Sequence, residues 1–114
     1  MEQANPSRPF WRQGDIYFVK LDQNGTGDLS GAKPVKDSVI ARGETTGHAH
    51  RVSPASIAAG ALLCLLQEAM FLQAPEAGAV IVHDEHGPVD LPEGVYAVVH
   101  QQEFDGLRMR QVWD

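Results

Sequence analysis

The chain has 114 residues, 43% of them hydrophobic and 21% charged, so it is long enough to bury one hydrophobic core without disulfide bonds. Nine Lys and Arg stand against fifteen Asp and Glu, and the net charge of −6 argues against nucleic acid or an anionic membrane as the partner. One cysteine excludes an intramolecular disulfide. Because the start resembles no signal peptide and no apolar run reaches the roughly 18 residues of a membrane span, we expect a cytoplasmic protein.

The chain is expected to consist of a short N-terminal extension, residues 1–11, followed by a single domain over residues 12–114. Its first strand is predicted at residues 15–21 (DIYFVKL), which are rich in β-branched and aromatic side chains. The following segment, DQNGTGDLSGAKP, is rich in Gly, Asn, Asp and Ser and indicates an exposed loop. A second strand is predicted at residues 37–42 (DSVIAR).

The stretch GETTGHAHRV predicts a turn into a further strand, residues 48–52, antiparallel to residues 37–42. Side chains alternate between the two faces of a strand. His48 and His50 should therefore lie on the same face.

The middle of the chain allows two interpretations. SPASIAAGALLCLLQEAMFLQ could form a helix with Ser53 as its N-cap and Pro54 at its first position. It could equally form a hairpin of two buried strands, ALLCLL and AMFLQA, around Gln67 and Glu68. Gly60 and the absence of a 3.6-residue apolar stripe favour the hairpin, with a short helical turn before it.

After Pro75 three more strands are predicted: AGAVIVHD, then VYAVVHQQEF, and LRMRQVW after the hairpin signal Asp105-Gly106. A segment rich in proline and glycine, EHGPVDLPEG, separates the first two. About eight short strands with little helix predict an all-β fold, either a small single-domain β-barrel or a two-sheet sandwich.

Four of the five histidines fall into two motifs, HAH and HDEH. Each motif alone is typical of an ordinary polar strand face or an acidic turn, but together they favour a site for one divalent transition metal. The expected ligands are His48, His50 and His86, with His83 or Glu85 as the fourth. Imidazole and carboxylate ligands suit Zn, Fe, Mn, Ni or Co. His100, in YAVVHQQ, is the next candidate ligand after these.

These motifs resemble those of two kinds of protein. The glycine turn followed by HxH, and the later GPVDLPEG, are loosely similar to the two motifs of small cupins, which are β-barrels; Ala97 stands where the histidine of their second motif would fall. RQGD, GETTGHAHRV, HDEHGP and LPEGVYAVVHQQEF together resemble small uncharacterised bacterial and phage proteins. That likeness covers about residues 12–114 and implies a shared fold and site, but no known reaction.

Two functions follow. In the first, the chain is a metal-binding barrel, and Glu44, Asp84 or Glu85 could act as general base if the metal is catalytic. In the second, it is a non-catalytic binding or scaffold module, such as a phage or accessory component, whose histidines are structural. The sequence leaves open whether it is an enzyme. The expected partners are a small-molecule ligand and, through the apolar stretch ALLCLLQEAMFL, a second copy forming a homodimer.

Overall fold

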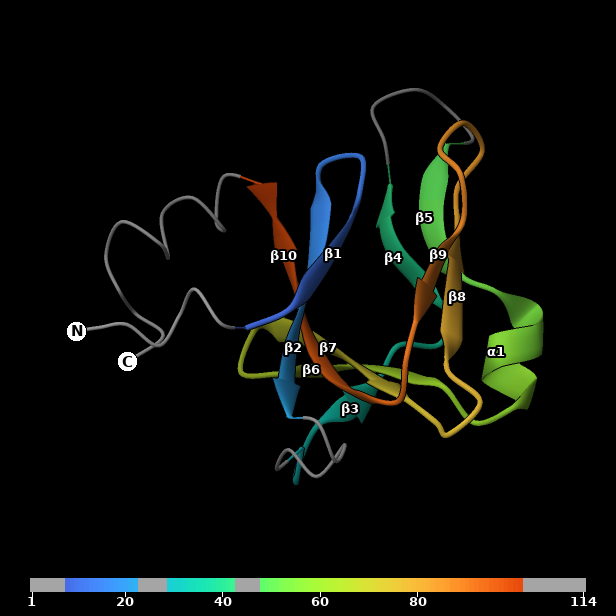
Figure 1. The fold of residues 1–114 in the computed structure, drawn as a ribbon. Coiled ribbons are helices and arrows are strands. Elements are labelled where there is room, and N and C mark those ends of the chain that lie inside the picture. The colour runs from blue at the N-terminus through green and yellow to red at the C-terminus, as the bar shows by residue number, and fades with distance from the viewer. Residues whose placement is uncertain (1–7, 23–28, 43–47, 102–114) are drawn as a thin grey trace.

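The computed structural model describes residues 8–22, 29–42 and 48–101, and the strands within these ranges form two antiparallel sheets (Figure 1). The larger sheet has the order β1 (Phe10–Gln13), β2 (Ile16–Asp22), β10 (Gly94–His100), β7 (Ala69–Ala74), β6 (Leu62–Leu66) and β3 (Lys33–Pro34). The smaller sheet has the order β4 (Val39–Arg42), β5 (Ala49–Val52), β8 (Ala79–Val82) and β9 (Val89–Leu91).

The all-β prediction is confirmed, and of its two forms the two-sheet arrangement is found rather than a closed barrel. Three short strands were not predicted: β1 lies partly in the expected N-terminal extension, β3 in the expected loop, and β9 between two prolines. Each has four residues or fewer and contains or adjoins proline or glycine, which indicate a turn or loop in the sequence. The predicted strand LRMRQVW and the Asp105-Gly106 turn lie outside the described residues.

The hairpin interpretation of the middle segment is confirmed. β6 pairs with β7 around Gln67 and Glu68, which take positive φ angles of 52° and 70°. Such angles are those of the tight turns that match the twist of a hairpin. The short helical turn is also present as α1 (Pro54–Ala58), where the Ser53 hydroxyl accepts a hydrogen bond from the Ser56 N–H at 3.1 Å.

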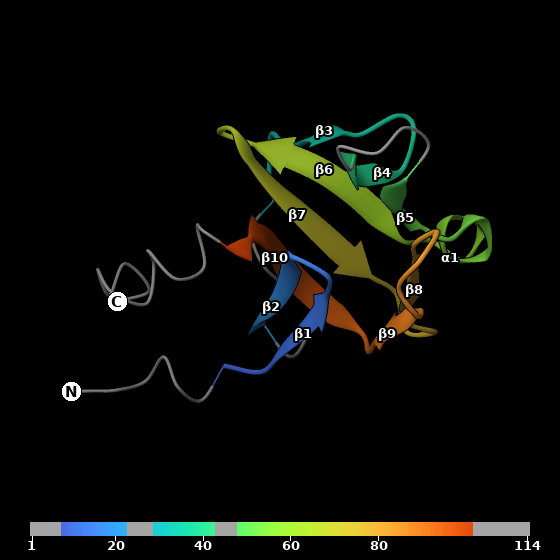
Figure 2. The same ribbon diagram turned by 90° about the horizontal axis from the view of Figure 1, so that it is seen from above.

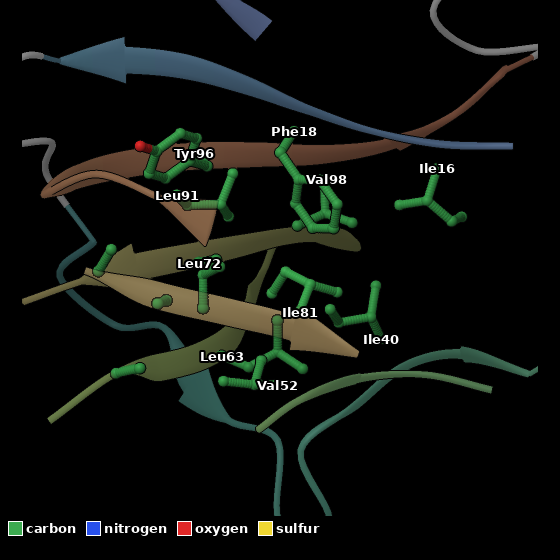
Figure 3. Packing of buried hydrophobic residues seen from close by; sticks show 13 residues of the cluster. Ile16, Phe18, Ile40, Val52, Leu63, Leu72, Ile81, Leu91, Tyr96 and Val98 are labelled. Atoms are coloured by element: carbon green, nitrogen blue, oxygen red, sulfur yellow. The ribbon is translucent and has the colours of Figure 1, made fainter. Parts of the chain in front are cut away.

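The hydrophobic core lies between the two sheets (Figure 3). Phe18, Leu72 and Tyr96 contribute from the larger sheet, and Ile81 and Leu91 from the smaller one, all at most 1% exposed. Burying side chains of this size stabilises the fold by about 1.5–3 kcal/mol each. The core therefore fixes the position of one sheet relative to the other, and with it the loops at their ends.

Four segments meet at one end of the molecule. The β1–β2 turn, the start of β5, the β8–β9 connection and the end of β10 all lie at the top of Figure 1, and Figure 2 looks onto this end from above. We call it the histidine end, because His48, His50, His83, His86 and His100 all belong to these segments.

Among the helices of the described ranges, none is long and apolar enough to cross a membrane.

Candidate functional site

Four imidazole rings from two segments lie against one another at the histidine end. His50, on β5, lies 4.4 Å from His83 and 6.1 Å from His86, measured between ring centroids. His83 lies 4.6 Å from His86 and 6.1 Å from His48. Since both His48 and His50 contact the His83 ring, the prediction that they share one face is confirmed.

The hairpin that positions the first two histidines is the predicted one. β4 and β5 pair antiparallel, with Arg42 opposite Ala49 and Ala41 opposite His50. The connecting segment GETTG, which includes the candidate base Glu44, lies outside the described residues.

His50 is the most buried of the four rings, with a side chain only 6% exposed. Its pKa is lowered from 6.5 to about 4, mainly by burial and also by the neighbouring His83, His86 and His100, while Asp15 opposes the shift. Its Nε2 atom lies 3.7 Å from Asp15 Oδ1. His50 is therefore neutral at pH 7, the form in which an imidazole can bind a metal.

A buried amide holds the other side of the His50 ring. Gln13, 2% exposed, lies at the end of β1, and its Oε1 is 2.8 Å from His50 Nδ1. Its Nε2 donates to the backbone carbonyls of Ile81 (3.1 Å) and Gly87 (2.9 Å). One side chain thus connects the larger sheet to β5, to β8 and to the β8–β9 connection.

His83 organises its own loop. Its Nδ1 accepts hydrogen bonds from the backbone N–H groups of Glu85 (3.0 Å) and His86 (3.2 Å). An imidazole nitrogen that accepts carries no proton, so in the neutral ring the proton is on Nε2. As it stands, neither His83 nitrogen offers a free lone pair to a cation.

Two carboxylates join the β8–β9 connection to the start of β5. Asp84 Oδ1 accepts from the N–H of Ala49 at 3.3 Å and lies 3.8 Å from Arg51 Nη1. The Ala49 hydrogen bond lowers the pKa of Asp84 most, and His48 and Arg51 lower it further. Glu85 Oε1 lies 3.6 Å from His48 Nδ1 and is mostly exposed. Asp84 therefore holds the two segments together, while Glu85 is available to a ligand.

The β1–β2 turn presses closely on the rings. Gly14 has a φ of +60°, and a Cβ atom added there would lie 2.8 Å from His86 Nε2 and 3.4 Å from His50 Cε1. Glycine is thus required both by the backbone conformation and by the approach of the imidazoles.

Each predicted ligand lies in this cluster, and His100 stands at the end of β10 close enough to influence His50. Nevertheless, no group of three or more His, Cys, Asp or Glu side chains in the described ranges is arranged to hold a metal ion. Whether the cluster binds metal therefore stays a prediction.

Sequence reasoning missed Gln13 and Asp15 as parts of the site. Both lie in RQGD, which served only as a point of resemblance to other proteins. A glycine between two polar residues just before a strand indicates a tight turn, but nothing in the sequence indicates that this turn faces the histidines. That proximity depends on the packing of β1 and β2 within the larger sheet.

The fold and the cluster define a small all-β domain with histidines gathered at one end. A sequence family described as "Domain of unknown function (DUF8820)" matches residues 12–101, and the chain belongs to this family. No curated protein and no solved structure matches the chain.

Proposed function

We propose that this protein is a metal-binding domain in which His48, His50 and His86 bind one divalent transition metal. The Glu85 carboxylate is the fourth protein ligand, and His83 orients the loop that carries Glu85 and His86. The single observation that carries the proposal is the contact of four imidazole rings at one end of an otherwise apolar sandwich.

The spacing of the rings supports the proposal. Two imidazoles that share a tetrahedral ion at metal–nitrogen distances of about 2.0–2.1 Å have centroids about 5 Å apart. His50 and His86, two of the proposed ligands, have ring centroids 6.1 Å apart, about 1 Å more than this. Binding then needs rotation of side chains but no movement of strands.

The side chains that must rotate are the less buried ones. His86 is exposed and His48 is 28% exposed, whereas His50 is held in place by burial and by Gln13. Rotation of an exposed side chain between rotamers costs little. His50 is thus the fixed ligand, and the other two close on the ion from their loops.

The ligand types restrict the ion. Imidazoles with one carboxylate suit Zn, Fe, Mn, Ni or Co, and the absence of thiolate from the cluster disfavours ions that prefer sulfur. The proposed ligand set, three histidines and Glu85, also differs from a closed structural site of four histidines, because a carboxylate ligand is readily displaced or joined by water. We assign no reaction to the site.

One observation favours the second function, a scaffold whose histidines are structural. His50 hydrogen-bonds Gln13 of the other sheet, and His83 hydrogen-bonds the backbone of its own loop, both without any ion. In that case the cluster holds the ends of the two sheets together.

Elemental analysis of protein purified without a histidine tag separates the two functions. We expect about one transition metal ion per chain, or its uptake by the metal-free protein in titrations with Zn²⁺ and with Co²⁺. The visible spectrum of bound Co²⁺ reports the number and type of its ligands. His50→Ala and His86→Ala should abolish tight binding, and Glu85→Gln should weaken it.

His100→Ala is the matched control, because it removes a histidine from the same end of the molecule but not from the proposed ligand set. It should bind metal like the wild type. Absence of binding by the folded wild type, or equal loss in His100→Ala and His86→Ala, would contradict the metal site and leave the scaffold function.

A further inference from the structure

The geometry points to Gln13 as the positioning residue of the site: it holds the His50 ring with its proton on Nδ1 and leaves the lone pair on Nε2. The positioning itself needs no ion, and its effect on metal binding rests on the function proposed above.

The orientation of the Gln13 amide follows from its partners. The backbone carbonyls of Ile81 and Gly87 can only accept hydrogen bonds, and one Gln13 atom lies 3.1 Å and 2.9 Å from them. That atom must be the NH₂ group, which has two protons to donate. The opposite orientation would place the Gln13 carbonyl oxygen against the carbonyl oxygens of Ile81 and Gly87 in a buried environment, with no proton between them.

The His50 tautomer follows from the orientation of the amide. With its NH₂ group engaged by two carbonyls, Gln13 presents Oε1 to His50 Nδ1 at 2.8 Å. Because a carbonyl oxygen accepts, Nδ1 must donate and therefore carries the proton. In the neutral ring Nε2 is then unprotonated, and this is the atom that lies toward Asp15.

This arrangement is the one that metal-binding histidines commonly have. A hydrogen bond from the second ring nitrogen to a carbonyl or carboxylate fixes the tautomer and the ring orientation, and its loss typically costs 10–100-fold in metal affinity. Gln13 is almost fully buried and comes from the other sheet, so the bond also fixes His50 against rotation.

The wild-type protein tests the proposal in its metal-free state. Two-bond ¹H–¹⁵N NMR spectra of the histidine rings distinguish a protonated from an unprotonated nitrogen. At pH 7 we expect His50 to carry its proton on Nδ1, and we expect both side-chain amide protons of Gln13 to exchange slowly with water. A proton on His50 Nε2, or rapid exchange of both amide protons, would overturn the proposal without any variant.

Gln13→Met keeps the length of the side chain but removes its amide. It should give a mixture of His50 tautomers and reduce affinity for Zn²⁺ by about 10–100-fold in competition titrations. Gln73→Met, the same change at an exposed position on β7, is the matched control and should alter neither. A His50 tautomer unchanged in folded Gln13→Met would contradict the proposal.

Gln13→Glu covers the case in which Gln13→Met does not fold. A carboxylate accepts from His50 Nδ1 but cannot donate to the two carbonyls, so the tautomer should persist while stability falls. Loss of the Nδ1 proton in this variant would count against the proposal. If the wild type shows the expected tautomer but binds no metal, the metal site fails and the positioning role stands.

Discussion

Two glycines in left-handed backbone conformations serve different parts of the molecule. Gly78, with φ +85°, precedes β8, and a Cβ there would lie 2.8 Å from the backbone carbonyl oxygen of Leu91. Gly14, with φ +60°, would place its Cβ at the same distance from the imidazole of His86. The first glycine makes room for main chain and so protects the fold. The second makes room for a side chain and so shapes the site.

The largest effect is expected from Gly78→Ala. The left-handed conformation costs an L-residue about 1–2 kcal/mol, and displacing backbone adds about 1–3 kcal/mol, so the free energy of unfolding should fall by roughly 2–5 kcal/mol. Urea denaturation measures this. The ring signals of His86 should keep their NMR shifts. A loss of stability no larger than that caused by Gly31→Ala, where an added Cβ meets nothing within 4 Å, would contradict the prediction.

Acid should act at the histidine end and on His50 in particular. Because burial lowers its pKa from 6.5 to about 4, the unfolded chain takes up this proton more readily than the folded one. The stabilising contribution of neutral His50 is complete above pH 6.5 and is lost as the pH falls toward 4, by about 3 kcal/mol. Urea denaturation of the metal-free protein at a series of pH values measures the loss.

His50→Leu supplies the comparison for this prediction, because a leucine side chain cannot take up a proton. The unfolding free energy of the wild type, relative to that of the variant, should therefore decrease as the pH falls from 6.5 toward 4. A difference that stays constant would contradict the assignment of the lowered pKa to a folded, buried His50.

Gly14→Ala should cost less than Gly78→Ala, about 2 kcal/mol, because the imidazole that it meets is the end of a side chain and can move aside. The His86 ring signals should shift and affinity for Zn²⁺ should fall. Gly31→Ala is the control, since Gly31 has a φ of +83° but nothing within 4 Å of its Cβ position. It should cost about 1 kcal/mol and leave metal affinity unchanged.

The smallest effect is expected where the backbone is left-handed without a glycine. Glu68, at the β6–β7 turn, has a φ of 70°. Glu68→Gly removes the steric cost of the side chain and should raise the free energy of unfolding by about 1 kcal/mol, as measured by urea denaturation. A loss of stability would show that the Glu68 side chain contributes contacts that outweigh its strain.

The sequence was sufficient for the longer strands and for the pairing of the two histidine motifs. The turn residues of GETTG, between residues 37–42 and 48–52, predicted the β4–β5 hairpin, and the proline-glycine segment after β8 predicted a turn carrying His86. These are local signals that residues near one another in the chain generate together.

The part that the sequence could not predict depends on contacts between distant segments. Gln13 and Asp15 reach the histidines only because β1 and β2 pair and then pack opposite the smaller sheet. A buried glutamine hydrogen-bonded to two carbonyls has no sequence signature, since its partners are backbone atoms that every residue carries.

The hydrogen bonds of Gln13 also constrain the order in which the molecule is built. They join residues separated by 37, 68 and 74 positions along the chain. Contacts over such separations form late, because the loops they close are long and costly in entropy. The histidine end is thus completed only after both sheets have met. An ion that binds His50 and His86 together would favour the folded chain, and at a hundredfold excess over its Kd, without affinity for the unfolded chain, it would stabilise the fold by about 2.7 kcal/mol.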